Sequence, residues 1–512
     1  MKRGLLIVFV AAFALYLPAA RYGFVQDDRA IIVSNPAAHS LSAALAAFDD
    51  PYWPRESGAG LYRPLTILSF AIDWTVSGGG GGGGSAGWFH LMNALWHALA
   101  TVLLTLILMR WLPALPALGA GLLFAWHPVH VEAVANLVGR AELLVAVGIL
   151  AAVLAARRGM WIVALVCAAA AMLGKEHGVI APVAILFDNW LEGAEAQRPP
   201  VWFWLALGVV TIAFLAAWRA IGVAGASDIA VVFYGKGMLE RLALALPIVA
   251  RAAELLVWPA SLSSDYSPQV IPMREGFSAA VLLGALIVVG VPFLIVWSYR
   301  RAPVIAFTAL LAALSYLPTS NLLFPSGVIL AERNLYLAVA LPAAVLGSGI
   351  TLLEQRRGSR AAVVALTIVM VLAGARSLIR LPAWRDNRAQ LLTLLSEHPE
   401  SYLGHASAAA VLAGRHDTAG ARREYNVADS LYADDPYLNA AHAIFLLGIS
   451  DTTAAKPLID RVRPVPRAQR FAWRAQFLLL VARGDRAGAA VTADSAIRRY
   501  LDDSPWYLAR FH

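Results

Sequence analysis

The chain has 512 residues, of which 59% are hydrophobic and only 14% are charged. This excludes an ordinary soluble globular protein, in which about a quarter of the residues are charged. The formal net charge of +8 does not indicate nucleic-acid binding, because membrane proteins collect basic residues in their cytoplasmic loops. Cys167 is the only cysteine, so an intrachain disulfide is excluded. The composition predicts a multi-pass membrane protein with room for one further domain.

Hydrophobic segments follow one another over residues 1–380, and we predict an all-α, polytopic membrane helix bundle with about eleven spans. The predicted spans are 4–21, 88–110, 114–127, 134–156, 160–174, 178–191, 201–221, 278–298, 303–317, 336–353 and 361–379. The first is interpreted as an uncleaved helix and not as a signal peptide. Lys2 and Arg3 place the N-terminus in the cytoplasm, so the C-terminus is expected on the outer, periplasmic side of the inner membrane.

Two long segments, 22–87 and 222–277, are predicted to lie on the outer side. The first contains the glycine run 78–84, which we interpret as a flexible linker because glycine loses the most entropy on ordering. The second contains the apolar run 239–258. This run carries four charged residues, so we interpret it as an interfacial or packed helix, although the sequence leaves a span open.

From about residue 381 the sequence becomes charged and rich in alanine, and a repeat of 34 residues is visible. Asp417, Asp451 and Asp485 keep this interval, as do one leucine and one alanine of each unit. A 34-residue period is typical of tetratricopeptide helix pairs, which stack because one pair cannot bury its own apolar face. We therefore predict a tetratricopeptide-like α-solenoid over 381–512. The alternative is an ordinary helical domain with a coincidental spacing.

Asp27 and Asp28 directly follow the first hydrophobic segment, where a membrane helix meets water. Charged side chains this close to a bilayer are costly, so their presence suggests a function. We predict that Asp27, with Asp28 beside it, is catalytic. The alternative is that the acidic pair only marks the end of the helix.

Other polar residues gather at the same ends of the predicted helices. His127, His130 and Glu132 are residue types that suit zinc or manganese, so a divalent metal ion is one interpretation. The other is a polar turn with capping histidines, and we assign no metal or other cofactor. Glu332 and Asp265 are further candidates for the functional site at these helix ends, but not as metal ligands.

Cationic residues at these helix ends are candidates for binding a phosphate. Arg333 begins a predicted helix, where the helix dipole also favours an anion, although a local pair with Glu332 is an alternative. The other phosphate candidates are Arg140, Lys175, His177 and Arg63. If the substrate is a sugar on a polyprenyl phosphate, such cations would stabilise the leaving phosphate and Asp27 would be the base for the acceptor hydroxyl.

Eight short blocks of the sequence resemble those of the transmembrane and tetratricopeptide-repeat O-mannosyltransferases, which are enzymes of the GT-C type. They cover about residues 20–340 in order and include the following stretches: Phe24-Val25-Gln26-Asp27-Asp28, Tyr62-Arg63-Pro64-Leu65-Thr66, Phe89-His90-Leu91 with Asn93 and His97, His127-Pro128-Val129-His130-Val131-Glu132, Val138-Gly139-Arg140-Ala141-Glu142, Gly174-Lys175-Glu176-His177-Gly178, Ser264-Asp265-Tyr266 and Glu332-Arg333 with Leu335-Tyr336. The repeats that follow match the same architecture.

The resemblance implies transfer of a sugar, mannose in characterised relatives, from a polyprenyl-phosphate donor to a protein Ser or Thr. It implies an inverting reaction on the outer membrane face, with the catalytic acidic pair of the class on Asp27 and Asp28. The acceptor protein would be held by the C-terminal repeats. The chain looks like a bacterial-type member, with about three repeats, so a different sugar or acceptor stays open.

Two other functions compete with this interpretation. An O-antigen polymerase or ligase would use a diphosphate-linked glycan and would favour arginine-rich outer loops over an aspartate pair. A non-catalytic membrane anchor that displays repeats would not need ionisable residues gathered at one depth of the bundle. A transporter is disfavoured because its polar residues would lie near the membrane midplane.

Overall fold

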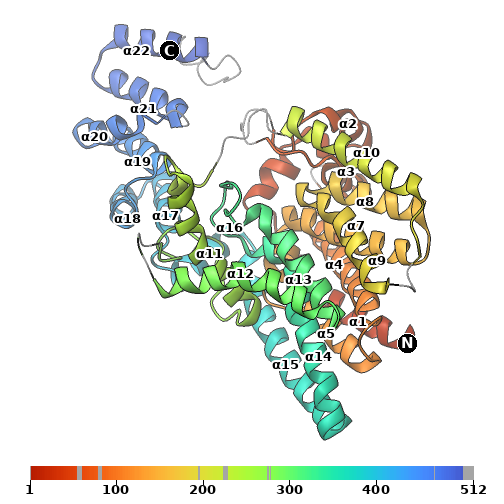
Figure 1. Cartoon of the computed structure of the whole chain (residues 1–512). Helices are drawn as coiled ribbons and strands as arrows, with labels where there is room; N and C mark the ends of the chain where they lie inside the picture. The colour runs from red at the N-terminus through yellow and green to blue at the C-terminus, as the bar shows by residue number, and fades with distance from the viewer. Residues whose placement is uncertain are drawn as a thin grey trace. The chain divides into compact units, whose positions relative to one another are not determined.

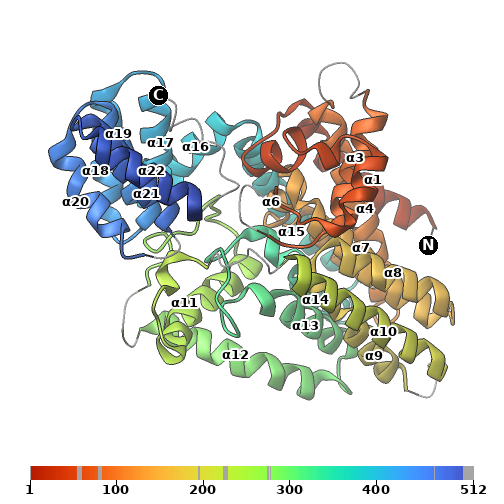
Figure 2. The same cartoon turned by 90° about the horizontal axis from the view of Figure 1, so that it is seen from above.

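The computed structural model describes residues 2–54, 60–78, 84–193, 197–222, 229–273, 276, 278–465 and 468–499 (Figures 1 and 2). Across these ranges every regular element is a helix, which confirms the predicted all-α class. The chain divides into two compact units. The first comprises Met1–Ala226, Lys236–Ser264 and Arg274–Gln390, and the second comprises Ser227–Gly235, Asp265–Met273 and Leu391–His512. Most of the predicted glycine linker, 79–83, lies outside the described residues.

The first unit contains every segment that the sequence predicted as a span, and each forms a helix. Its helices are α1 (Lys2–Leu15), α2 (Leu41–Ala46), α3 (Pro64–Val76), α4 (Ala86–Leu108), α5 (Ala114–Trp126), α6 (His130–Ala135), α7 (Arg140–Arg157), α8 (Trp161–Gly174), α9 (Ala181–Glu192), α10 (Val201–Ala217), α11 (Met238–Val257), α12 (Ala279–Ser298), α13 (Pro303–Tyr316), α14 (Ala340–Arg357) and α15 (Ser359–Arg380). Short 3₁₀ turns join several of them. The predicted span 134–156 is interrupted, because a turn separates α6 from α7.

Seven helical stretches of the described chain are long and apolar enough to cross a membrane, so the protein is a multi-pass membrane protein. They are Lys2–Arg21, Ala86–Leu108, Leu137–Arg157, Val201–Gly222, Ala279–Ser298, Leu337–Arg357 and Ser359–Trp384. Three of the other predicted spans correspond to shorter apolar helices, Ala114–Trp126, Trp161–Gly174 and Pro303–Thr319. The stretch around α7 is almost wholly buried, whereas α12 is almost wholly exposed. A uniformly apolar exposed surface such as that of α12 suits contact with lipid.

The helix α11 coincides with the apolar run 239–258 and is not among the seven stretches. The helix is excluded because it carries several charged residues. Among them, Arg251 forms an ion pair with Glu254, and Glu240 caps the first turn. Such side chains are expensive in the hydrocarbon of a bilayer.

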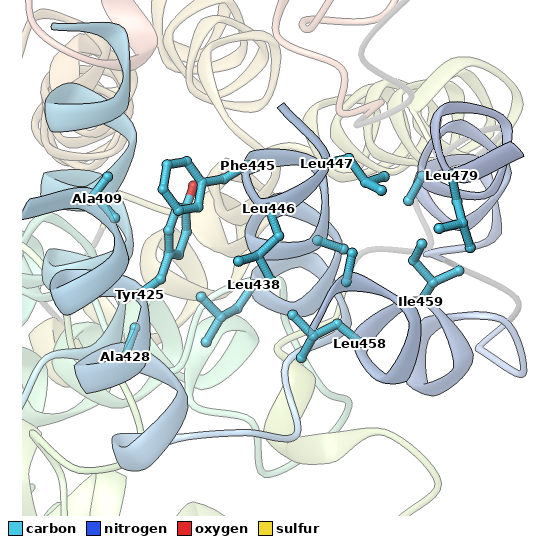
Figure 3. Close-up of a cluster of buried hydrophobic side chains, with 14 of the residues drawn as sticks. Ala409, Tyr425, Ala428, Leu438, Phe445, Leu446, Leu447, Leu458, Ile459 and Leu479 are labelled. Atoms are coloured by element: carbon cyan, nitrogen blue, oxygen red, sulfur yellow. The ribbon is translucent and has the colours of Figure 1, made fainter. Parts of the chain in front are cut away.

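The second unit contains three helix pairs at the interval that the sequence repeats. The pairs are α17 (Tyr402–Gly414) with α18 (Thr418–Leu431), α19 (Pro436–Gly448) with α20 (Thr452–Val462), and α21 (Gln469–Ala482) with α22 (Arg486–Arg499); α16 (Asn387–Glu397) precedes them. Figure 3 shows side chains of the core that successive pairs share, among them Tyr425, Phe445, Ile459 and Leu479.

The three aspartates of the 34-residue interval all occupy the same structural position. Asp417, Asp451 and Asp485 precede the second helix of each pair, and each carboxylate accepts a hydrogen bond from the backbone N–H three residues later, at 2.8, 3.1 and 2.8 Å. This is the bond of an N-cap, which satisfies one of the unpaired donors at a helix start. The sequence period is therefore a period of helix caps.

Candidate functional site

Asp28 connects the segment after the first helix to the turn that precedes α7. Its carboxylate is fully buried and accepts hydrogen bonds from the backbone N–H of Val25 at 2.9 Å and of Val138 at 3.0 Å. Burial raises the pKa of Asp28 to about 7, although these backbone bonds oppose the rise. Because both of its oxygens face backbone N–H groups, Asp28 positions its neighbours and does not face a substrate.

The turn that Asp28 contacts, η7 (Leu137–Gly139), comes very close to the end of α6. A Cβ atom on Gly139 would collide with the carbonyl oxygen of Ala133, so only glycine fits at this position. The contact lets the N–H of Val138 reach Asp28, and it places the start of α7 beside the aspartate pair.

Asp27 is partly exposed, and it follows a residue in an unusual backbone conformation. Gln26 has a φ of 47°, a region that residues other than glycine rarely adopt, and its N–H donates to the side chain of Asn387 at 2.8 Å. Outliers of this kind gather at functional sites, where the surrounding structure enforces them. Here Gln26 and Asp28 together fix the backbone on both sides of Asp27.

Arg333 lies within electrostatic range of Asp27 and is held by Glu132. Its backbone N–H donates to Glu132 Oε2 at 3.0 Å, and its guanidinium donates to Oε1 of the same carboxylate. Burial alone would lower the pKa of Arg333, but the negative charges of Glu132, Asp27 and Glu142 outweigh this effect, and the pKa ends above its usual range. The side chain of Arg333 keeps 25% of its surface exposed, so it can meet a ligand.

The histidines around Glu132 support the turn that carries Arg333. His130 Nε2 donates to the carbonyl of Tyr336 at 3.0 Å, and His97 Nδ1 accepts from the hydroxyl of Tyr336 at 2.7 Å. His127 Nε2 donates instead to the carbonyl of Leu256 at 3.2 Å. Burial is the main cause that holds the pKa of His127 down at about 4.

The candidate metal ligands His127, His130 and Glu132 thus turn to three different partners. Within the described residues, no group of three or more His, Cys, Asp or Glu side chains is arranged to hold a metal ion. The block is better understood as a clamp on the turn η13 (Glu332–Leu335).

Lys175 and His177 meet the carboxylate of Glu142 on the first turn of α7. Lys175 Nζ donates to Glu142 Oε1 and, at 3.1 Å, to Asn334, while His177 Nε2 lies 3.3 Å from Glu142 Oε2. Burial lowers the pKa of Lys175, and it lowers the pKa of His177 to about 4. His177 is therefore neutral near pH 7, and Lys175 is the cation of this pair.

Arg63 makes a bidentate ion pair with Glu176 and covers the ring of Tyr52. Its Nε lies 3.1 and 3.2 Å from the two oxygens of Glu176, and Nη2 lies 3.0 Å from Oε2. The guanidinium carbon lies 4.9 Å from the centre of the Tyr52 ring. Burial opposes the charge on Arg63, but Glu176 and Tyr52 more than offset it and raise the pKa.

Arg140 does not join these cations. It is fully buried, and it donates to Asp73, to Asn93 Oδ1 at 2.7 Å, to the carbonyl of Phe89 at 3.0 Å and to that of Ser69 at 3.3 Å. A guanidinium that is fully bonded inside the bundle has no donor directed to a ligand, so we leave Arg140 out of the phosphate site.

Glu332 and Asp265 also have structural partners elsewhere. Glu332 is fully buried and accepts a hydrogen bond from the N–H of Ser263 at 2.6 Å. Asp265 belongs to the second unit, where it accepts from the hydroxyl of Ser401 at 2.6 Å; Ser401 in turn caps α17. Burial raises the pKa of Asp265 against this bond.

The structure thus brings together Asp27 and three cations of distant segments, Arg333, Lys175 and Arg63. Each cation is held by a glutamate, and Arg333 and Lys175 also meet at η13, which carries Arg333 and Asn334. Sequence reasoning missed Tyr52 and Asn334 as parts of this cluster. Neither residue carries a charge or a repeated spacing that would mark it.

Comparison with known proteins gives a consistent answer. The chain is 27% identical to protein O-mannosyl-transferase Tmtc1 of Drosophila melanogaster, over 80% of this chain and 59% of that protein. It is 39% identical to Tmtc2 of the same organism, over 36% of this chain and 21% of that protein. It is 28% identical to human TMTC3, over 66% of this chain and 41% of that protein. The predicted resemblance to the TMTC O-mannosyltransferases is confirmed.

The likeness to the TMTC proteins has a limited extent. The chain spans 59% or less of the length of the three relatives named above. No protein-family model and no solved structure matches it.

Proposed function

We propose that this protein is a membrane glycosyltransferase that moves a sugar, mannose in the first instance, from a polyprenyl phosphate to a hydroxyl of a protein acceptor on the outer membrane face. The observation that carries the proposal is that Asp27 and Arg333 lie within electrostatic range of each other. A partly exposed carboxylate and a partly exposed guanidinium are within electrostatic range of each other, although 306 residues separate them. The names of the relatives support the same class of reaction.

The proposed chemistry needs one base and one site for an anion. Asp27 takes the proton from the acceptor Ser or Thr hydroxyl, and the oxygen attacks the anomeric carbon of the sugar. The bond between that carbon and the phosphate oxygen breaks, and polyprenyl phosphate leaves with the electron pair. A single displacement of this kind inverts the anomeric centre. Arg333, Lys175 and Arg63 would stabilise the charge that develops on the phosphate.

The substitution Asp27→Asn tests the base. It keeps the shape of the side chain but removes its ability to take a proton, so transfer from polyprenyl-phosphate mannose to an acceptor peptide should fall by at least about 100-fold. Asp49→Asn, an exposed aspartate of the same loop segment, is the matched control and should keep full activity. Full activity of the Asp27→Asn protein would remove Asp27 from the mechanism.

A wild-type protein that transfers no sugar from this donor would reject the proposed function. Activity with a diphosphate-linked glycan in its place would favour a polymerase or ligase. The C-terminal repeats would hold the acceptor protein in the proposed reaction, and a pull-down of acceptor peptides on the full chain tests this separately.

A further inference from the structure

The hydroxyl of Tyr52 is buried inside the first unit without a partner. The residue is only 3% exposed, its ring packs in a core with Phe70 and Trp74, and its oxygen makes no hydrogen bond to any described residue. A buried hydroxyl without a partner destabilises the folded state, so such groups call for an explanation. Phenylalanine would fill the same space without this cost.

The position of Tyr52 is fixed by its backbone and by Arg63. Its N–H donates to the carbonyl of Leu61 at 2.8 Å, and Leu61 has a φ of 67°. The guanidinium of Arg63 lies over one face of the ring, in the geometry of a cation–π contact. The hydroxyl is therefore held in place by contacts that do not involve its own oxygen.

The charged groups around the hydroxyl are those of the candidate site. Burial raises the pKa of Tyr52; Asp27 and Asp28 raise it further, while Arg63 and Arg333 lower it. The hydroxyl therefore lies within range of the proposed base and of two proposed phosphate cations. Because it stays protonated near pH 7, it can donate a hydrogen bond.

We propose that the Tyr52 hydroxyl donates a hydrogen bond to a phosphate oxygen of the polyprenyl-phosphate donor. The inference rests on the function proposed above and adds a binding residue to it. Phosphate is favoured over a sugar hydroxyl because two of the side chains around Tyr52, Arg63 and Arg333, are cations that attract an anion. A phosphate that draws Arg63 away from Glu176 would also uncover the ring that Arg63 now covers.

The first experiment measures binding without turnover. Full-length Tyr52→Phe protein in detergent is titrated with polyprenyl phosphate, and ligand binding is followed by thermal stabilisation. Loss of one hydrogen bond to a charged group should weaken binding about 10- to 100-fold. The unliganded variant should be at least as stable as the wild type, because it no longer buries an unpaired hydroxyl.

Tyr316→Phe is the matched control. The hydroxyl of Tyr316, at the end of α13, is also buried without a partner in the described chain, but Tyr316 is not among the charged cluster. It should bind polyprenyl phosphate as the wild type does. Equal binding by the Tyr52→Phe protein and the wild type, or equal weakening by both variants, would overturn the assignment of Tyr52.

The second experiment separates this inference from the proposed function. With polyprenyl-phosphate mannose as donor, KM of the Tyr52→Phe protein should rise in parallel with its weaker binding of polyprenyl phosphate. A higher KM with unchanged binding of polyprenyl phosphate would mean contact with the sugar, and it would refute the phosphate contact. If binding depends on Tyr52 but the wild type transfers no mannose, the proposed function fails and the Tyr52 contact stands.

Discussion

Glu132 holds Arg333 at two points, since its carboxylate accepts hydrogen bonds from both the backbone N–H and the guanidinium of that residue. One buried side chain therefore fixes both the course of η13 and the direction of its cation. His130, two residues before Glu132 on α6, bonds the carbonyl of Tyr336 at the end of the same turn. The guanidinium of Arg333 is therefore preorganised for a ligand, because the entropy of ordering this side chain is lost on folding and not on binding.

Glu132→Gln should raise KM for the polyprenyl-phosphate donor by about tenfold, because Arg333 loses a charged partner and no longer points in one direction. The variant should also unfold at a lower temperature. Glu254→Gln is the control: it weakens a surface Glu–Arg pair on α11, and such pairs contribute little. Donor kinetics and thermal unfolding are measured together. An unchanged KM for Glu132→Gln would contradict the clamp.

Asp28 should make the stability of the protein depend on pH. Its pKa is raised from 3.8 to about 7 by burial, so the ionised form is disfavoured in the folded state. The contribution of protonated Asp28 to the free energy of unfolding is fully present below about pH 4. It decreases as the pH rises from about 4 to 7, and above about pH 7 the free energy of unfolding no longer changes through Asp28. Each unit of pKa shift corresponds to about 1.4 kcal/mol. Unfolding midpoints in urea between pH 4 and 8 should show this decline, and Asp28→Asn should flatten it. An equal slope in both proteins would refute the prediction.

Replacement by lysine should affect mainly the stability of the protein at Arg140 and mainly the donor KM at Arg333. Arg140→Lys cannot keep four hydrogen bonds and leaves Asp73 poorly paired, so it should destabilise the protein by about 3–5 kcal/mol. The protein that remains folded should keep its KM for the donor. Arg333→Lys should instead raise the donor KM with a smaller loss of stability. A specific effect of Arg140→Lys on donor binding would return Arg140 to the phosphate site.

The three capping aspartates of the repeats should each contribute to stability by about 1 kcal/mol. Asp417→Ala removes the bond to the N–H of Gly420 and should lower the unfolding temperature of the chain. Asp434→Ala, at an exposed aspartate that does not cap a helix, is the control. Differential scanning calorimetry compares the two variants. Equal unfolding temperatures would mean that the 34-residue interval has another cause.

Much of the fold follows from local pattern. Uninterrupted apolar segments predict helices wherever backbone groups must be paired within one segment, and all eleven predicted stretches are helical. Their ends shift by a few residues because caps and 3₁₀ turns decide where a helix stops. The interval of Asp417, Asp451 and Asp485 was visible because a cap depends only on residues three positions away.

The site was less accessible to sequence reasoning because its members pair across the chain. Arg140 and Arg333 look alike in sequence. Only the structure shows that Arg140 is buried and bonded to Asp73 and Asn93, whereas Arg333 is held by Glu132 and stays partly exposed. The histidines of the 127–132 block bind carbonyls of Leu256 and Tyr336, which no local spacing reveals. Tyr52 carries no motif at all.

The path of the chain between the two units has a practical consequence for anyone who wishes to study the repeats in isolation. Segments 227–235 and 265–273 belong to the same compact body as the C-terminal helices, yet residues of the membrane body precede and follow each of them. A single cut near residue 390 would strip the repeats of both segments, including the Asp265 that anchors Ser401. A fragment that begins near residue 390 would therefore not contain the whole of the second unit.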